Sequence, residues 1–376
     1  MKTRAIIVRS TSLGDFICMI PFINDLKDLY DEIIIFEISK RSSISNLLIE
    51  NKKIKTIHFN SNNKISLFRD FIKNREDFYK TKRKNIVFFA GLSEFFFKKK
   101  TIYKIFLYKI FGFDLKFHPY NYPNLKYSSR VEKNLVQLGP LINVSKIPYL
   151  INNLKRKSNR NENLKFISLP KYKYFLTKKV IESIENKNLN IALFISAKES
   201  YKIWDQENWV KIIKSVNKNF KCNFFIIGGP TDLKASNFFC EKNKDIKNIF
   251  NLAGKLTPKG TMSFLQDCNL YIGNDASPMH MSAAVGLHCI SIFSNFEKFG
   301  LWEPLISNSS VSHRPGIKFE RNSKNYGINT VNYTFVLEDI MCFLNNNHEK
   351  NKHIIKEHYS KNIISTISIQ NGFYDF

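Results

Sequence analysis

LYIGNDASPMHMSAAVG, residues 270–286, is the stretch that decides the fold. Its first residues form a short apolar run that predicts a β-strand, and residues 277–285 have the composition of a helix. Asp275 and Ser277 lie at the start of that helix, where unpaired backbone N–H groups bind phosphate. Small side chains would let this helix pack closely against a sheet: Ser282, Ala283, Ala284 and Gly286. His280 either donates to such a phosphate or simply fills the first helical turn.

The same alternation of strand and helix extends from this segment in both directions and predicts a doubly wound α/β domain. The expected strands lie at 190–196, 222–229, 248–254, 270–275 and 288–293. The expected helices lie at 206–216, after Asp232, at 258–267 and at 277–285. A further helix candidate after Thr334 is followed by a polar, poorly patterned end.

The first half of the chain alternates in the same way. Strands are expected at 5–9, 32–38, 55–59 and 85–89, and helices at 15–30 and 42–51. The pattern breaks at 92–123, where we expect an insertion or surface helix, before a helix-like segment at 127–138 and a polar approach to a linker at 152–165. Because 376 residues exceed what one core usually supports, we expect two Rossmann-like domains, 1–170 and 186–345, and a C-terminal tail, 346–376.

The composition is compatible with several kinds of anionic partner and does not distinguish among them. The formal net charge of +26 at pH 7 concentrates any anionic partner, whether nucleic acid, phospholipid or phosphorylated glycan, or it is only a solvated basic surface. The cluster FFFKKK within 92–111 suits an anionic membrane surface, unless its Phe belong to the core and its Lys to solvent. Because no nucleic-acid motif is recognised, nucleic acid is not an expected partner.

The chain shows no targeting, membrane-spanning or metal-binding pattern. The start imitates a signal peptide, but Arg9 and Asp15 interrupt the apolar run, which favours a first strand. The apolar stretch 86–97 contains Glu94 and is shorter than the roughly 18 to 20 residues that a spanning helix needs. The six Cys form no C-x-x-C pair and no His cluster has metal-ligand spacing, so we expect a cytoplasmic protein without structural zinc.

Reactive side chains follow several expected strands, at the carboxyl edge where doubly wound sheets bind ligands. In RSTSLGDFICMIP, Gly14 permits close backbone approach and Asp15 lies near a helix start. Asp15 is either a general base for an acceptor hydroxyl or a helix-capping residue.

Two more turns carry weaker signals. In FISAKESYKIWDQENW, Ser196, Lys198 and Lys202 either neutralise a departing diphosphate or belong to a basic surface loop whose Trp204 and Trp209 pack in the core. In IIGGPTDLKAS, Asp232 either accepts hydrogen bonds from ribose hydroxyls or caps the next helix.

Together these segments resemble glycosyltransferase family 9, the lipopolysaccharide heptosyltransferase family. The resemblance rests on STSLGDFICMIP, KIWDQENW, IIGGPTD, and LAGKLTP followed by YIGNDASPMHMSAAVG, in this order and over most of the chain. It implies the GT-B fold, two Rossmann-like doubly wound domains facing each other across a cleft. It also implies transfer of heptose or a related sugar from an ADP-heptose-like donor to a lipopolysaccharide core or other anionic glycan or glycolipid, with inversion and without a metal or cofactor.

The resemblance further implies a role for each matching residue. Asp15 would be the catalytic base, with Ser12 and Gly14 on the acceptor side, and Lys202 would bind the donor diphosphate beside Ser196. The base pocket would be lined by backbone groups of Leu252, Ala253 and Gly254.

The remaining matches concern the ribose, the sugar and the phosphates of the donor. Asp275 would lie at the donor sugar, with backbone N–H groups of Ala276 and Ser277 offered to phosphate. The chain departs from the family at Asp232, where Glu is usual for the ribose, and at Ser277, where Gly is common. A family member that uses another nucleotide sugar, or a non-catalytic basic protein that binds nucleic acid or membrane, remains the alternative.

Overall fold

The computed structural model describes residues 3–9, 13–17, 20, 23, 26–27, 30–39, 52–60, 84–89, 169–296, 302–304, 309–316, 327–348, 352–359, 362–370 and 373–375. It divides the chain into two compact units, Met1–Arg156 with Lys165–Ser168, and Lys157–Leu164 with Leu169–Phe376. The segments for which we stated expectations at 42–51, 92–123, 127–138 and 152–165 lie outside the described residues.

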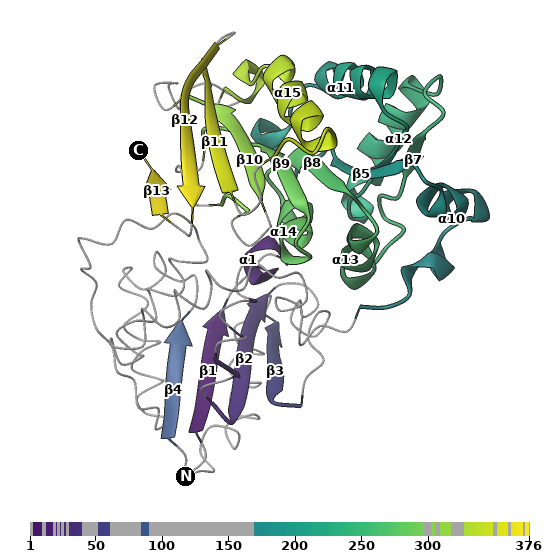
Figure 1. Ribbon diagram of the computed structural model, residues 1–376. Coiled ribbons are helices and arrows are strands. Elements are labelled where there is room, and N and C mark those ends of the chain that lie inside the picture. The colour runs from purple at the N-terminus through teal and green to yellow at the C-terminus, as the bar shows by residue number, and fades with distance from the viewer. Residues whose placement is uncertain are drawn as a thin grey trace. The chain divides into compact units, whose positions relative to one another are not determined.

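The N-terminal unit contains a parallel sheet with the strand order β3-β2-β1-β4 (Figure 1). Its strands are β1 (Thr3–Arg9), β2 (Glu32–Ser39), β3 (Ile54–Asn60) and β4 (Lys84–Phe89). The helix α1 (Leu13–Ile17) follows β1. Because the chain moves outward from β1 to β3 and then adds β4 on the other side of β1, this unit has the order of a doubly wound sheet.

The C-terminal unit contains a nine-stranded sheet with the order β13-β12-β11-β10-β9-β8-β5-β6-β7. Its strands are β5 (Leu189–Phe194), β6 (Cys222–Ile226), β7 (Ile249–Asn251), β8 (Leu270–Asn274), β9 (His288–Ile292), β10 (Ser310–Pro315), β11 (Lys352–Tyr359), β12 (Asn362–Gln370) and β13 (Phe373–Asp375). Neighbouring strands from β7 to β11 pair in parallel. Taken in chain order, β5 to β10 have the 3-2-1-4-5-6 arrangement of the dinucleotide-binding fold.

Side-chain caps fix where several helices of this unit begin. The helices are α10 (Lys178–Glu185), α11 (Gln206–Asn219), α12 (Leu233–Lys242), α13 (Pro258–Gln266), α14 (Ser277–Ala284) and α15 (Tyr333–Leu344). The side chains of Asp205, Thr257 and Asn332 accept hydrogen bonds from backbone N–H groups in the first turns of α11, α13 and α15. Such caps favour a helix at that register because they satisfy N–H groups that have no partner within the helix.

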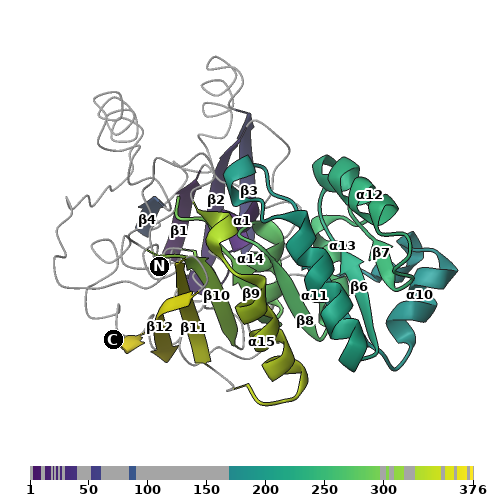
Figure 2. The ribbon, with the colours of Figure 1, turned by 90° about the horizontal axis from the view of Figure 1, so that it is seen from above.

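The central strands of this unit are buried on both faces. One set of alternate residues, with Leu193 and Ile226 among them, shares a core with Trp209 of α11 and Ile340 of α15. These two helices pack side by side on that face (Figure 2). The intervening residues face the other layer, where the ring of Phe225 packs edge-on against Phe264 of α13, with centroids 5.2 Å apart.

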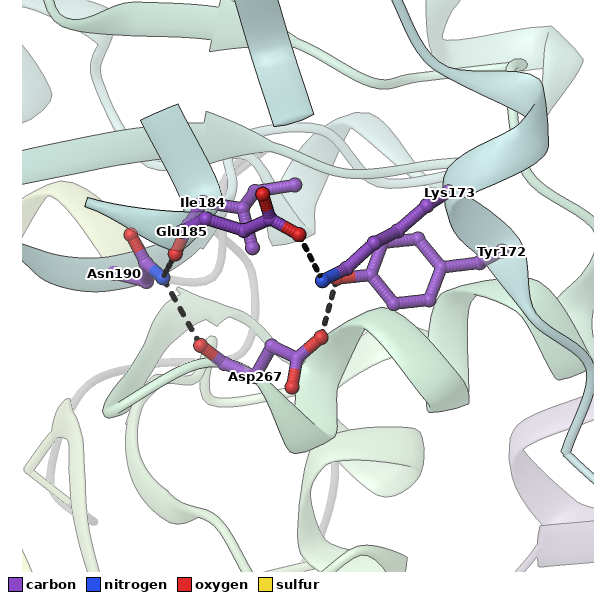
Figure 3. Close-up of polar contacts among 6 residues, drawn as sticks. All are labelled: Tyr172, Lys173, Ile184, Glu185, Asn190 and Asp267. Atoms are coloured by element: carbon purple, nitrogen blue, oxygen red, sulfur yellow. Dashed lines mark hydrogen bonds and ion pairs between the residues drawn. The ribbon is translucent and has the colours of Figure 1, made fainter. Parts of the chain in front are cut away.

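The start of the C-terminal unit is held by a polar cluster (Figure 3). The hydroxyl of Tyr172 donates to the Asp267 carboxylate just after α13. Lys173 Nζ donates to Glu185 Oε1 at 2.7 Å, at the end of α10. The Asn190 side-chain amide bridges the backbone carbonyls of Ile184 and Asp267 at 2.9 and 3.1 Å. The segment that enters this unit is therefore tied to α10, α13 and β5.

The C-terminal residues form strands, where we expected a polar, poorly patterned tail. β11 extends the parallel sheet beside β10, and β12 and β13 then add antiparallel strands. Polar side chains join this part of the sheet to α15: Lys356 Nζ lies 2.7 Å from Asp339 Oδ2, and His313 Nε2 lies 3.2 Å from the same oxygen. His313 Nδ1 also lies 2.9 Å from His358 Nε2. Tertiary contacts of polar side chains thus contribute to holding β10 and β11 against α15.

Among the residues that the structure describes, no helix combines the length and the apolar character that a membrane crossing requires.

Two buried histidines make the C-terminal unit sensitive to acid. Burial lowers the pKa of His288 to about 3 and, with the nearby His313 and Lys356, lowers that of His358 to about 3. An unfolded histidine has a pKa of about 6.5. Between about pH 6.5 and about pH 3 the two histidines take up a proton in the unfolded chain but not in the folded one. The contribution of the two neutral histidines to stability is therefore complete above about pH 6.5 and decreases as the pH falls toward 3.

We therefore expect the free energy of unfolding to decrease from pH 7 to pH 5, by up to about 1.4 kcal/mol per pH unit for each of these histidines. Urea unfolding of the wild type, His288→Gln and His358→Gln at pH 5, 6 and 7 measures the slope. Each variant should show a shallower decrease than the wild type. An equal slope in all three proteins would contradict this assignment.

Candidate active site

The strand order of the C-terminal unit places a topological switch point between β5 and β8. From β5 the chain moves outward to β6 and β7, whereas from β8 it moves the opposite way to β9 and β10. The connections after β5 and β8 therefore diverge, and the carboxyl ends beside such a divergence are where doubly wound sheets bind ligands. Ser196 and Lys202 follow β5, and Asp275 follows β8.

Lys202 and Asp275 form an ion pair at this switch point. Lys202 Nζ donates to Asp275 Oδ2 at 2.6 Å, and the two side chains are 18% and 6% exposed. Lys202 ends a short 3-10 helix, Ser200–Lys202, whereas the Asp275 backbone N–H is fixed by the carbonyl of Ile292 at 3.1 Å. Because an unpaired buried charge is costly, each of these two groups needs a partner of opposite charge.

The segment after β5 serves the core and the site together. Trp204 and Trp209 are both fully buried, with ring centroids 5.1 Å apart in an edge-on arrangement. Trp204 Nε1 donates to the carbonyl of Val331 at 3.1 Å. The Lys198 side chain is 89% exposed and lies 3.8 Å from Glu199. The structure therefore separates the two lysines of this segment: Lys202 is at the switch point, and Lys198 points into solvent.

Ser196 adds a buried hydroxyl beside this pair. Ser196 is buried, and among the described residues its Oγ atom has no hydrogen-bond partner. Its backbone carbonyl accepts from Asn274 Nδ2 at 3.3 Å, which fixes the turn after β5 to the end of β8. Because buried hydroxyl groups nearly always have a partner, Ser196 is a candidate for contact with ligand oxygens.

The start of α14 adjoins Asp275. Ala276 has an extended backbone and precedes Ser277 and Pro278, the first residues of the helix. Their position matches the expected phosphate-binding turn, since the first N–H groups of a helix lack partners within it. His280 is only 4% exposed, and its ring packs against that of Trp302 with centroids 5.8 Å apart.

The turn after β6 uses Asp232 within itself. Asp232 Oδ2 accepts from the backbone N–H of Gly229 at 2.8 Å, and a Cβ atom at Gly228 would lie only 2.9 Å from that side chain. Burial raises the pKa of Asp232, and the Gly229 N–H partly opposes this shift. One carboxylate oxygen is thus engaged by the turn itself, and the side chain makes no capping hydrogen bond to α12.

The segment from Leu252 to Gly254 follows β7 and is held against the turn after β6. The N–H of Leu252 donates to the carbonyl of Ile226 at 2.8 Å, and that of Gly254 donates to the carbonyl of Gly228 at 3.0 Å. Gly254 has a φ of 73°, which a residue without Cβ adopts most easily. Leu252 and Ala253 are buried. Backbone from β6 and β7 is thus brought together on the β6 side of the switch point.

Sequence reasoning missed two pairs near the same edge. Tyr201 and Phe296 follow β5 and β9, the two neighbours of β8, and their rings lie 4.6 Å apart. Arg314 lies near the end of β10, with its Nη1 atom 3.1 Å from Glu303 Oε1, and both side chains are only 2% exposed. No local pattern marks these residues, because each partner comes from a different loop or strand.

Two of the candidates in the N-terminal unit fall within α1. Gly14 is buried, and Asp15 is part of the helical backbone that follows β1. Ser12 and the Asp15 side chain lie outside the described residues. In the part of the chain that the structure describes, no group of three or more His, Cys, Asp or Glu side chains is arranged to hold a metal ion.

Known protein structures share this architecture. A family 9 glycosyl transferase from Veillonella parvula has a TM-score of 0.64 at 16% identity, over 92% of this chain and 97% of that one. The E. coli ADP-heptose lipopolysaccharide heptosyltransferase II has a TM-score of 0.62 at 15% identity, over 92% and 99%. An E. coli heptosyltransferase solved with ADP has a TM-score of 0.58 at 12% identity, over 92% and 100%. These similarities show the GT-B fold.

A known sequence family matches part of the chain. No curated protein sequence matches the chain. The sequence model of glycosyltransferase family 9 (heptosyltransferase) matches residues 153–328, which include the switch point and the Lys202–Asp275 pair. These residues therefore form a glycosyltransferase family 9 domain, and the chain that contains it is a glycosyltransferase.

Proposed function

We propose that this chain transfers heptose or a closely related sugar from an ADP-heptose-like donor to a lipopolysaccharide core or another surface glycan. The observation that carries the proposal is the Lys202–Asp275 pair, which presents an ammonium group at the switch point of a family 9 domain. An ammonium group there suits the negative charge of a donor diphosphate. The names of the similar E. coli proteins, which specify ADP-heptose and ADP, support this choice of donor.

The proposed reaction is a direct displacement that inverts the anomeric centre. Asp15 accepts the proton of an acceptor hydroxyl as its oxygen forms a bond to the anomeric carbon. The bond from that carbon to the diphosphate oxygen breaks, and the nucleoside diphosphate leaves with the electron pair. Lys202 and the start of α14 stabilise the charge that develops on the leaving group.

The other residues after β5 to β8 bind parts of the donor in this proposal. Ser196 Oγ contacts a phosphate or sugar oxygen, and Asp275 lies at the sugar. Backbone groups of Leu252, Ala253 and Gly254 border the base. We place the reaction in the cytoplasm, with a glycolipid acceptor at the inner-membrane surface, where the net charge of +26 favours contact with anionic lipid.

A donor other than ADP-heptose is the second candidate. One Asp232 carboxylate oxygen is already engaged by Gly229, and Asp is shorter than the Glu expected for a ribose contact. The Asp232 carboxylate is therefore less available to accept hydrogen bonds from a ribose than the family pattern implies. A thermal-shift panel of ADP-, UDP- and GDP-sugars separates the two candidates, since only the true donor class should raise the melting temperature strongly.

Lys202→Ala should lower the affinity for the donor and kcat/KM, by about 100-fold or more in kcat/KM, because the leaving diphosphate loses its cationic partner. Isothermal calorimetry with the best nucleotide sugar and a transfer assay measure the two effects. Lys214→Ala is the matched control, since Lys214 lies in α11 with 56% of its side chain exposed. Equal activity of Lys202→Ala and the control would contradict the assignment.

Asp15→Ala should abolish transfer while the donor still binds with nearly the affinity of the wild type, because the base acts on the acceptor. The assay uses purified donor and acceptor, with donor binding followed in parallel. Normal turnover by this variant would show that another group removes the proton.

Transfer should proceed at an unchanged rate after exhaustive treatment with EDTA, because Lys202 and the start of α14 supply the positive charge at the leaving group. NMR of the glycan product should show the anomeric configuration opposite to that of the donor. A rate restored only by added divalent cation, or a retained configuration, would overturn this part of the mechanism.

A further inference from the structure

The ion pair at the switch point opposes the binding of a diphosphate there. The Lys202 ammonium group already contacts a carboxylate at 2.6 Å. The cation near the end of β10 is matched in the same way, since Arg314 lies 3.1 Å from Glu303 and both of those side chains are 2% exposed. An incoming diphosphate therefore meets a site in which negative charge is present before it arrives. Repulsion between the diphosphate and a buried carboxylate opposes binding.

The two partners of the pair differ in how easily they can move. Lys202 has the longer side chain, is 18% exposed and lies on a single short turn. Asp275 is 6% exposed and lies between the buried strand β8 and α14, with its backbone N–H bonded to Ile292. A diphosphate that arrives from solvent therefore reaches Lys202 before Asp275. Lysine also changes partners readily, since its charge is a point at the end of a flexible stem.

We propose that Asp275 is an exchangeable counter-ion, which holds Lys202 in the unliganded protein and releases it to the diphosphate of the donor. This inference rests on the proposed function. The released carboxylate is mostly buried, and it needs new hydrogen-bond donors. The hydroxyl groups of the donor sugar supply them.

The exchange makes the site favour the donor over the nucleoside diphosphate product. With the intact nucleotide sugar, Lys202 binds the diphosphate and Asp275 binds sugar hydroxyl groups, so both charges are satisfied. After transfer the sugar is gone and Asp275 is left facing the diphosphate without a partner. Lys202 then returns to Asp275 and the product leaves. Asp275 is thus a specificity-determining residue that weakens product inhibition.

The test measures affinities for the nucleotide sugar and for the matching nucleoside diphosphate by calorimetry, with ADP, UDP and GDP each tried. Asp275→Asn removes the charge and keeps the size. We expect this variant to bind the nucleoside diphosphate about tenfold more tightly than the wild type. Its affinity for the nucleotide sugar should be unchanged or weaker, because the hydrogen bonds to sugar hydroxyl groups weaken. A residue that only stabilised the fold would weaken both ligands together.

Asp339→Asn is the matched control. Asp339 pairs with Lys356 at 2.7 Å, and these side chains are 14% and 16% exposed, so this Lys–Asp pair resembles the first in distance and burial. It joins α15 to β11, and its loss should leave both affinities within about twofold of the wild type. Melting temperatures without ligand report whether either variant is poorly folded.

The outcomes separate this inference from the proposed function. Unchanged or weaker binding of the nucleoside diphosphate by a folded Asp275→Asn overturns the exchange and leaves the donor assignment standing. If that variant does not fold, the wild type decides, because tighter binding of the nucleoside diphosphate than of the nucleotide sugar also overturns the exchange. A wild type that binds neither class of ligand overturns the proposed function itself.

Discussion

The reversal of direction between β5 and β8 is the constraint on which the chemistry of the C-terminal unit depends. Parallel pairing from β7 to β11 brings the carboxyl ends of these strands to one edge of the sheet. Turns that are far apart in the sequence meet there, as the Lys202–Asp275 bond and the backbone bonds of Gly254 show. The connections diverge only at the reversal, so this part of the edge is available to a ligand.

The electrostatics of this edge differ from what the net charge of +26 suggests. Most lysines in the described part of the chain are exposed. Exposed charges contribute little to specific binding because water and salt screen them. The ammonium group at the switch point, that of Lys202, is mostly buried and contacts the Asp275 carboxylate. In our proposal, specificity for a phosphorylated ligand comes from a local exchange of partners, whereas the overall charge affects how fast anions approach.

Sequence patterns predicted β5, β6, β8 and β9 well, because these strands are buried along nearly their whole length and appear as continuous apolar runs. They missed β10, SVSHRP, which is equally buried but polar. Its Ser310, His313 and Arg314 contact His353, His358 and Glu303, which come from other segments. Pairings of this kind depend on the folded chain, so no local pattern reveals them.

In the candidate site, too, local features were predictable whereas contacts between distant residues were not. The sequence pointed to Lys202 and Asp275 separately, through their positions after strands, and the structure joins them. It left two roles open for Asp232, and the structure adds a third contact, the hydrogen bond from Gly229 within the turn. The pairing of Tyr201 with Phe296 had no signal, since it depends on β5 and β9 flanking β8. Residue type and position after a strand were predictable, whereas partners were not.

The outermost strands of the nine-stranded sheet affect whether another chain can add a strand to it. The outermost strands, β7 and β13, are each three residues long, whereas β12 beside β13 has nine. An edge strand presents unpaired backbone groups on which another chain can add a strand, and long, flat edges invite aggregation. The strand β13 pairs with only the last three residues of β12, Ser368–Gln370. Within the described residues, the outer side of β12 from 362 to 367 therefore has no strand beside it, and this is where a strand of another chain could add to the sheet.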